Sequence, residues 1–149
     1  MAAAADEPNL LGNPGFEISE GDGVAWTQHY RKTVDFEFDA SVAHAGKHSA
    51  RCRLAASKDR TGVSQRLNLN QEQAVPMLVS LWYRTDGVTG PVHRSFALGL
   101  GIEYTTDLRK DRMDDAVIVP FEPGTHGWRE LTRAFVPQVP IRYMHVHCE

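Results

Sequence analysis

The sequence predicts an all-β domain in which antiparallel strands form a β-sandwich or a barrel. At least seven short runs alternate apolar and polar residues with a period of two, which marks strands with one buried face. Clusters of Gly, Pro, Asn and Asp separate these runs. The chain has 149 residues, which is enough for one domain with its own hydrophobic core.

The predicted strands follow one another along the whole chain. They cover residues 34–39, 47–54, 62–69, 77–84, 96–104, 128–136 and 141–148. In the fourth run the alternation predicts that Met77, Val79, Leu81 and Tyr83 share the apolar face. Residues 106–117 are rich in charge and lack a sustained apolar stripe, so we expect a charged loop with one helical turn.

The run 96–104 carries two glycines on one face. Its apolar face holds Phe96, Leu98, Leu100, Ile102 and Tyr104, and its other face holds Ala97, Gly99, Gly101 and Glu103. Glycine weakens a strand and often marks a place where a ligand or another backbone approaches closely. A bend or a bulge explains the same glycines equally well, so the sequence leaves both interpretations open.

Composition and charge exclude several classes of function. Charged residues make up 23% of the chain and apolar residues 42%, which is typical of a globular domain. The formal net charge is −3 with His neutral, so no basic surface predicts nucleic-acid binding. No apolar run approaches about 18 residues, and we expect no membrane span. Cys52 and Cys148 are either two small buried thiols or one disulfide.

Five motifs, in order along the chain, resemble those of a known family. They are NLLGNPGFE at 9–17 followed by Trp26, AGKHSARC at 45–52, QRLNL at 65–69, VSLWYRT at 79–85 and GWRELTRAFVP at 127–137. The chain resembles carbohydrate-binding modules of families four, nine and twenty-two. The resemblance implies a galactose-binding-like jelly roll over residues 9–149 that lacks the family's final strand. Residues 1–8 are expected to be a disordered start that does not belong to the domain.

The resemblance also implies a role for Glu17, which closes the opening motif. In those modules this Glu commonly binds a structural Ca²⁺ together with a backbone carbonyl, here around Lys47 or His48. An Asp on the final strand completes the family's set, and no such segment occurs before Glu149. Because Ca²⁺ takes carboxylate and carbonyl oxygens, Glu17 and Lys47 are the expected calcium residues.

Aromatic and charged residues on the predicted strands form the expected carbohydrate site. A sugar stacks its C–H face on an aromatic ring and exchanges hydrogen bonds with charged or amide side chains. Trp82 and Arg84 are the first candidates, and Glu103, Arg66 and His145 follow. We expect Trp82, Arg84, Arg66 and Glu103 to face the same way as the glycines of 96–104. Exposed strand residues without a ligand are the alternative for both arginines.

Other aromatic and histidine residues carry weaker expectations. Trp26 and Tyr30 lie beside the loop after the opening motif, where a second sugar contact at the sandwich edge is expected. Trp128 takes the position of the family's buried Trp and is expected in the core. His145 and His147 stand two apart on the last run, a spacing that suits a metal, but the sequence indicates no third ligand.

The expected function is noncatalytic binding of a polysaccharide or oligosaccharide. The resemblance implies an accessory module of a larger, secreted glycoside hydrolase or polysaccharide-degrading enzyme, in contact with other domains of that enzyme. The alternative is a structural or protein-docking β-sandwich without glycan binding. The sequence contains no G-x-S-x-G, H-E-x-x-H or P-loop motif, and nothing in it pairs two carboxylates for glycoside hydrolysis.

Overall fold

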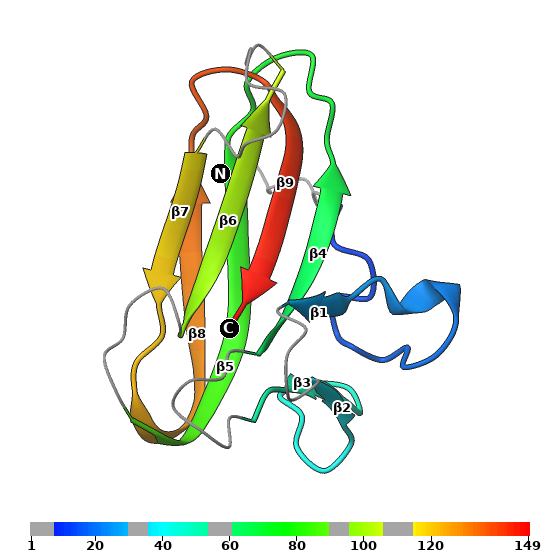
Figure 1. The fold of residues 1–149 in the computed structure, drawn as a ribbon, viewed down its shortest axis with the longest axis vertical. Helices are drawn as coiled ribbons and strands as arrows, with labels where there is room; N and C mark the ends of the chain where they lie inside the picture. Colours follow the sequence, from blue (N-terminus) through cyan, green and yellow to red (C-terminus); the bar gives the residue numbers. More distant parts are fainter. Residues whose placement is uncertain (1–7, 30–35, 54–60, 90–95, 106–114) are drawn as a thin grey trace, which may run out of the picture.

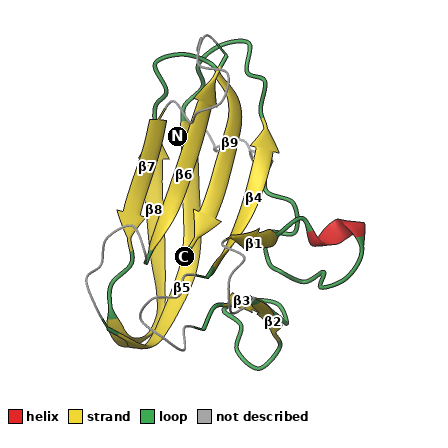
Figure 2. Cartoon of the chain, in the orientation of Figure 1, coloured by secondary structure: helices red, strands yellow, loops and turns green. Residues whose placement is uncertain are grey.

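A computed structural model describes residues 8–29, 36–53, 61–89, 96–105 and 115–149. These residues form antiparallel β-strands and one short 3-10 turn, η1 (Asp22–Val24) (Figure 2). The strands are β1 (Thr27–His29), β2 (Glu37–Asp39), β3 (Ser49–Arg51), β4 (Gly62–Asn68), β5 (Met77–Val88), β6 (Ala97–Tyr104), β7 (Asp115–Pro120), β8 (Gly124–Phe135) and β9 (Ile141–Cys148). Within the described ranges, no helix is long and apolar enough to cross a lipid bilayer.

The strands form one large sheet and two separate pairs of antiparallel strands. The large sheet has five strands in the order β1-β4-β9-β6-β7, and β5 pairs with β8 while β2 pairs with β3. Strands β5 and β8 lie behind β6 and β9 in Figure 1, so two antiparallel layers face each other. The prediction of an all-β, antiparallel fold is confirmed, and the two layers are consistent with a β-sandwich.

The core lies between the two layers. Leu98, Leu100 and Ile102 of β6 are 0% exposed, as the alternation of that run predicts. From the opposite layer, the partly buried residues Met77, Val79, Leu81, Tyr83, Leu131 and Phe135 pack against this cluster. The predicted apolar face of the run 77–84 is therefore also confirmed, because a period of two places every second side chain on one face.

Strand β7 was not predicted. Its residues 115–117 fall in the segment that the sequence assigns to a charged loop, and the preceding residues 106–114 lie outside the described part of the chain. The pairs Gly99↔Ile118 and Leu98↔Val119 join this short strand to β6. Charged residues directly before this strand interrupt the alternation of apolar and polar residues in the sequence. Pairing with the longer strand β6 stabilises a short strand that would be weak by itself.

The opening stretch is tied to the sheet by side-chain hydrogen bonds. Asn13 Nδ2 donates to the carbonyl of Ile18 at 2.8 Å, and Trp26 Nε1 donates to the carbonyl of Asn13 at 2.9 Å. Gln65 of β4 accepts from the amide of Gly12 at 2.8 Å and donates to its carbonyl at 2.9 Å. These bonds explain why turn-forming residues and apolar residues alternate in this segment: the chain turns repeatedly while it packs against the domain.

The two cysteines do not form a disulfide. Cys52 and Cys148 are free thiols. Burial, together with the nearby Cys52, raises the pKa of the Cys148 thiol to about 12, so this sulfur stays protonated at neutral pH. A thiol in this state is a poor nucleophile and a poor metal ligand.

Candidate functional site

The outward faces of β4, β9 and β6 carry most of the polar side chains that the sequence singled out. Directly opposed residues of antiparallel strands place their side chains on the same face. Three rows run across these strands: Ser64–His147–Gly99, Arg66–His145–Gly101 and Asn68–Tyr143–Glu103. We call this surface the glycine-floored face. It looks toward the viewer in Figure 1, because β5 and β8 lie behind it.

The glycines of β6 make room for the histidines of β9. A Cβ atom added at Gly99 would lie 2.0 Å from His147 Nε2, so the imidazole occupies the space that a side chain at Gly99 would need. In the next row, Gly101 lies opposite His145. Of the two interpretations of these glycines, close approach of other atoms therefore holds at Gly99, and the approaching atoms belong to the protein itself.

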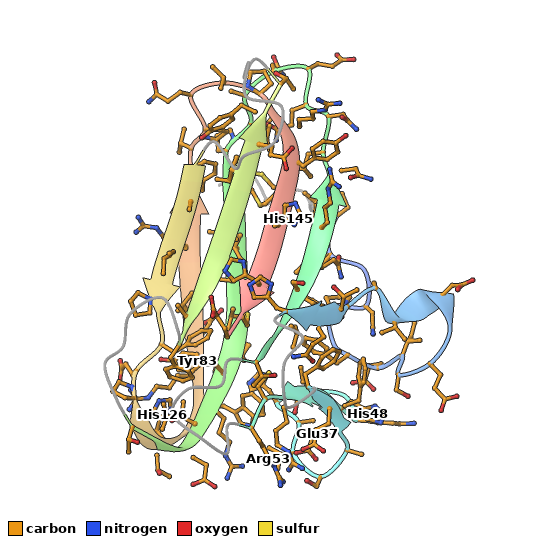
Figure 3. All side chains as sticks on the ribbon, in the orientation of Figure 1. Glu37, His48, Arg53, Tyr83, His126 and His145 are labelled. Carbon is orange, nitrogen blue, oxygen red and sulfur yellow. The ribbon has the colours of Figure 1, made fainter. Side chains whose placement is uncertain are left out.

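Four side chains form a charged and aromatic group on this face. The guanidinium carbon of Arg66 lies 3.9 Å from the ring centroid of Tyr143, a cation–π distance. His145 Nε2 lies 3.9 Å from Glu103 Oε1, and both side chains remain about one third exposed. Figure 3 shows His145 on β9, between β4 and β6. Together these groups place hydrogen-bond donors and a hydrogen-bond acceptor beside an aromatic ring.

The pKa of His145 is lowered. Burial of the ring is the main cause, the positive charge of Arg66 adds to it, and the carboxylate of Glu103 opposes it. A neutral imidazole has one donor and one acceptor nitrogen, and it can therefore exchange hydrogen bonds with a hydroxyl group in either direction. Near neutral pH this group of four side chains accordingly carries one fixed cation, one carboxylate and one neutral imidazole.

Trp82 and Arg84 do not share this face, so that part of the sequence-based expectation is wrong. Both belong to β5 in the other layer, where Trp82 pairs with Glu130 of β8 and is 45% exposed. The alternation correctly predicts that Trp82 points away from the core. Alternation cannot tell which of two layers a strand joins, because inward and outward faces exist in both.

The outward surface of β5 and β8, which we call the hairpin face, is aromatic. The ring of His44 stacks on Trp82 at a centroid distance of 4.0 Å and an interplanar angle of 10°. The same ring contacts Trp128 edge-on at 5.6 Å. Trp128 is thus partly buried beneath His44 and does not belong to the buried core cluster, which corrects its predicted core position.

The expected second contact at the sandwich edge is only partly visible. Trp26 is 7% exposed and stacks on Phe16 at 4.9 Å, so its ring packs within the protein and offers little surface to a sugar. Tyr30 lies outside the described residues. Of the seven carbohydrate-binding candidates, the structure brings Arg66, Glu103 and His145 together.

Glu17 meets the residues that the resemblance indicates, but through amide groups. Its Oε1 accepts hydrogen bonds from the backbone amides of Lys47 at 2.9 Å and His48 at 3.2 Å. A side chain at Gly46 would collide with this carboxylate, since an added Cβ would lie 2.2 Å from Oε1. These amides, that of Lys47 first, lower the pKa of Glu17. Amide donors take up lone pairs that Ca²⁺ would need.

Two arginines of the second predicted strand, residues 47–54, are already paired elsewhere. Arg51 forms ion pairs with Glu37 and with Asp39, the latter at 2.7 Å, and Arg53 lies 3.5 Å from Glu37. In Figure 3 Glu37 and Arg53 lie at the β2–β3 pair, well away from His145. Among the candidate arginines in the described residues, Arg66 is the one that lies on the glycine-floored face.

A group of possible metal ligands lies at the end of the same face. Within the described ranges, His29, His147 and Glu149 place one ligand atom each within 4.8 Å of the others. The sequence pointed to His147 but not to this partnership. His29 reaches the group because β1 pairs with β4. The residue pattern within one strand does not predict such long-range pairing.

Comparison with known proteins identifies no relative. No protein-family model matches the chain, and a search of curated proteins finds no significant match.

Proposed function

We propose that the chain is a noncatalytic carbohydrate-binding domain whose ligand lies on the glycine-floored face. The observation that carries the proposal is the strand register, which sets Arg66 and His145 in one row and Tyr143 and Glu103 in the next. On this proposal the domain is a jelly-roll accessory module of a secreted, glycan-active enzyme. It raises the local concentration of the partner catalytic domain on its polymer.

The chemistry of the four side chains suits a sugar. The carboxylate of Glu103 accepts hydrogen bonds from a pair of hydroxyls, and the guanidinium of Arg66 donates to ring or hydroxyl oxygens. The neutral imidazole of His145 serves either role. The guanidinium of Arg66 lies over the ring of Tyr143 at 3.9 Å and holds it in place, so part of the site is ordered before a ligand arrives. With one cation and one carboxylate, the group favours a neutral glycan over a strongly acidic one.

Calorimetric titration against a panel of neutral and acidic polysaccharides tests the proposal. Arg66→Ala and Tyr143→Ala should abolish measurable binding. Arg84→Ala and Trp82→Ala are matched controls on the hairpin face, and both should bind like the unaltered chain. The reverse result would move the site to the hairpin face, and a folded chain that binds no glycan in the panel would end the proposal.

A structural Ca²⁺ at Glu17 is a separate proposal, and it rests on the resemblance. Added calcium should raise the melting temperature of the unaltered chain and leave that of Glu17→Gln unchanged. Calcium without effect on the unaltered chain would leave Glu17 as a carboxylate that only caps the amides of Lys47 and His48.

A docking domain is the second candidate, favoured by exposed apolar residues on one layer. Leu78 of β5 is 68% exposed and Val136, directly after β8, is 69% exposed. The pair Met77↔Phe135 places the two residues at the same end of the hairpin face. Solvent-facing apolar groups of this size are a feature of surfaces that other domains cover. Reduced binding of a hydrophobic dye by Leu78→Ser and Val136→Ser, in a chain without glycan affinity, would favour this candidate.

A further inference from the structure

Three side chains from two distant segments meet at one end of the glycine-floored face. His29 is the last residue of β1, His147 lies in β9, and Glu149 follows β9. His147 Nε2 lies 3.7 Å from Glu149 Oε1, and the rings of His29 and His147 have centroids 4.4 Å apart. Residues more than one hundred positions apart in the chain thus form one compact group.

The register explains why these three side chains share a face. Glu149 continues β9, because its amide and carbonyl exchange hydrogen bonds with those of Ala97 at 3.2 and 3.0 Å. Its side chain therefore points the same way as that of His147, two positions earlier. His29 pairs with Gly62, the first residue of β4, and reaches the group across that strand.

Two glycines lie directly against the group, where a side chain would collide with it. Gly62 stands between His29 and the end of β9, and an added Cβ there would lie 2.2 Å from the Cys148 carbonyl oxygen. Gly99 lies beneath the imidazole of His147. A larger residue at either position would displace the ligands, so the backbone is fitted to this arrangement of side chains.

We propose that His29, His147 and Glu149 bind one divalent metal ion of the zinc type. Two imidazoles and one carboxylate are a donor set that suits zinc and its neighbours among the transition metals better than Ca²⁺. Three protein ligands leave a further position for water or for a ligand atom. The proposal does not depend on glycan binding by the same face.

The observed distances require only side-chain adjustment. Zinc bonds of about 2.0–2.2 Å place neighbouring ligand atoms about 3.3–3.6 Å apart in a tetrahedral site. The His147–Glu149 separation of 3.7 Å is already close to this range, and all three ligand atoms lie within 4.8 Å of one another. The two rings are 20° from parallel, so each must turn about its Cβ–Cγ bond to aim a nitrogen at a shared ion.

Burial of the carboxylate strengthens the case. The side chain of Glu149 is 5% exposed and that of His147 is 17% exposed. Low access to water means that these side chains, and not a full hydration shell, would surround an ion at this position. The two imidazoles bind it in their neutral form, as metal binding requires.

Zinc titration by calorimetry on the untagged, chelator-treated chain is the test. We expect one zinc ion per chain, and Co²⁺ in its place should give the visible absorption bands of a site with nitrogen and oxygen ligands. His29→Ala, His147→Ala and Glu149→Gln should each weaken zinc binding by more than the roughly 10- to 100-fold loss seen when only the groups supporting a ligand are changed. His145→Ala, on the same strand and face, is the matched control and should retain the affinity.

Several results would overturn the proposal. An unaltered chain without saturable zinc binding and without cobalt bands would do so, and this measurement stands even where a variant fails to fold. Folded ligand variants that bind zinc as tightly as the unaltered chain would do the same. Loss of binding in His145→Ala would place the metal on the neighbouring His145–Glu103 pair and would reject the assignment.

Discussion

The two outward faces of the domain differ in what lies between their large side chains. On the glycine-floored face, Gly99 has no side chain, and the imidazole of His147 occupies that space. On the hairpin face, the ring of His44 fills the space above Trp82 at a stacking distance of 4.0 Å. An exposed aromatic residue is therefore not by itself an open binding platform. Missing side chains, as much as those present, decide how the side chains of the neighbouring strand lie.

The largest effect is expected from a methyl group placed in the tightest part of the glycine-floored face. Gly62→Ala forces a Cβ against the Cys148 carbonyl oxygen, which is backbone and cannot swing away. We expect a loss of about 1–3 kcal/mol in the free energy of unfolding, the usual cost of overpacking. Urea denaturation followed by circular dichroism measures it.

Gly127→Ala on β8 is the matched control for that change. No heavy atom lies within 4 Å of a Cβ added at Gly127, so the free energy of unfolding should stay within about 0.5 kcal/mol of the original. Equal losses in the two variants would remove the proposed contrast in packing between the faces.

A smaller effect is expected at Gly99. In Gly99→Ala the new methyl group meets the end of the His147 side chain, which can rotate away, so the cost should be below that of Gly62→Ala. The imidazole resonances of His147 and His29 should nevertheless shift in NMR spectra, because the two rings are stacked. In the double variant with His147→Ala the stability cost should disappear, and its persistence would mean that the methyl group clashes elsewhere.

Acid should weaken the domain through His145. Its pKa is lowered in the folded chain, so below the ordinary value of about 6.5 the unfolded chain binds the proton more readily than the folded one. Stability contributed by the neutral ring is therefore present above that pH and is lost as the pH falls below it. His145→Gln should lose less melting temperature between pH 7.5 and 5.5 than the unaltered chain.

NMR titration of His145 checks the cause of that shift. Arg66→Gln removes the nearby positive charge and should raise the pKa of His145, whereas Glu103→Gln should lower it further. A pKa that responds to neither variant would contradict the assignment of these groups to one electrostatic cluster.

The smallest effect on stability is expected on the hairpin face. His44 is exposed, so His44→Ala should change the free energy of unfolding little, but it uncovers one side of Trp82. Quenching of tryptophan fluorescence by acrylamide should become more efficient. Unchanged quenching would mean that His44 does not cover Trp82 in solution.

Pattern analysis succeeded where the relevant information is local. The alternation in the runs 62–69, 77–84, 96–104 and 141–148 identified strands close to the observed bounds and the residues that face the core. It missed the three-residue strand β1 and also β7, whose short apolar stretch follows a charged segment. The core position of Trp128, which the resemblance implied, was wrong. A strand's alternation follows from its own pleat, whereas its neighbours do not appear in its sequence.

The same distinction between local pattern and long-range strand pairing applies to the residues of the candidate site. Arg66, Glu103 and His145 were identified from residue type and outward position, and the structure places them in adjacent rows of one sheet. Trp82 and Arg84 satisfied the same criteria and lie in the other layer. The sequence did not indicate Glu149 as a candidate metal ligand. Its proposed partner His29 belongs to β1, which lies far away in the chain.

The sequence by itself determined the class of the fold and the inward and outward side of most strands, because side-chain alternation is a local property of the extended backbone. Only the tertiary structure decided which outward faces coincide, since that depends on long-range strand pairing. It joined β4, β9 and β6 into one glycine-floored face and moved β5 to the other side of the core. It also brought His29, His147 and Glu149 together, through hydrogen bonds between strands that are distant in the chain.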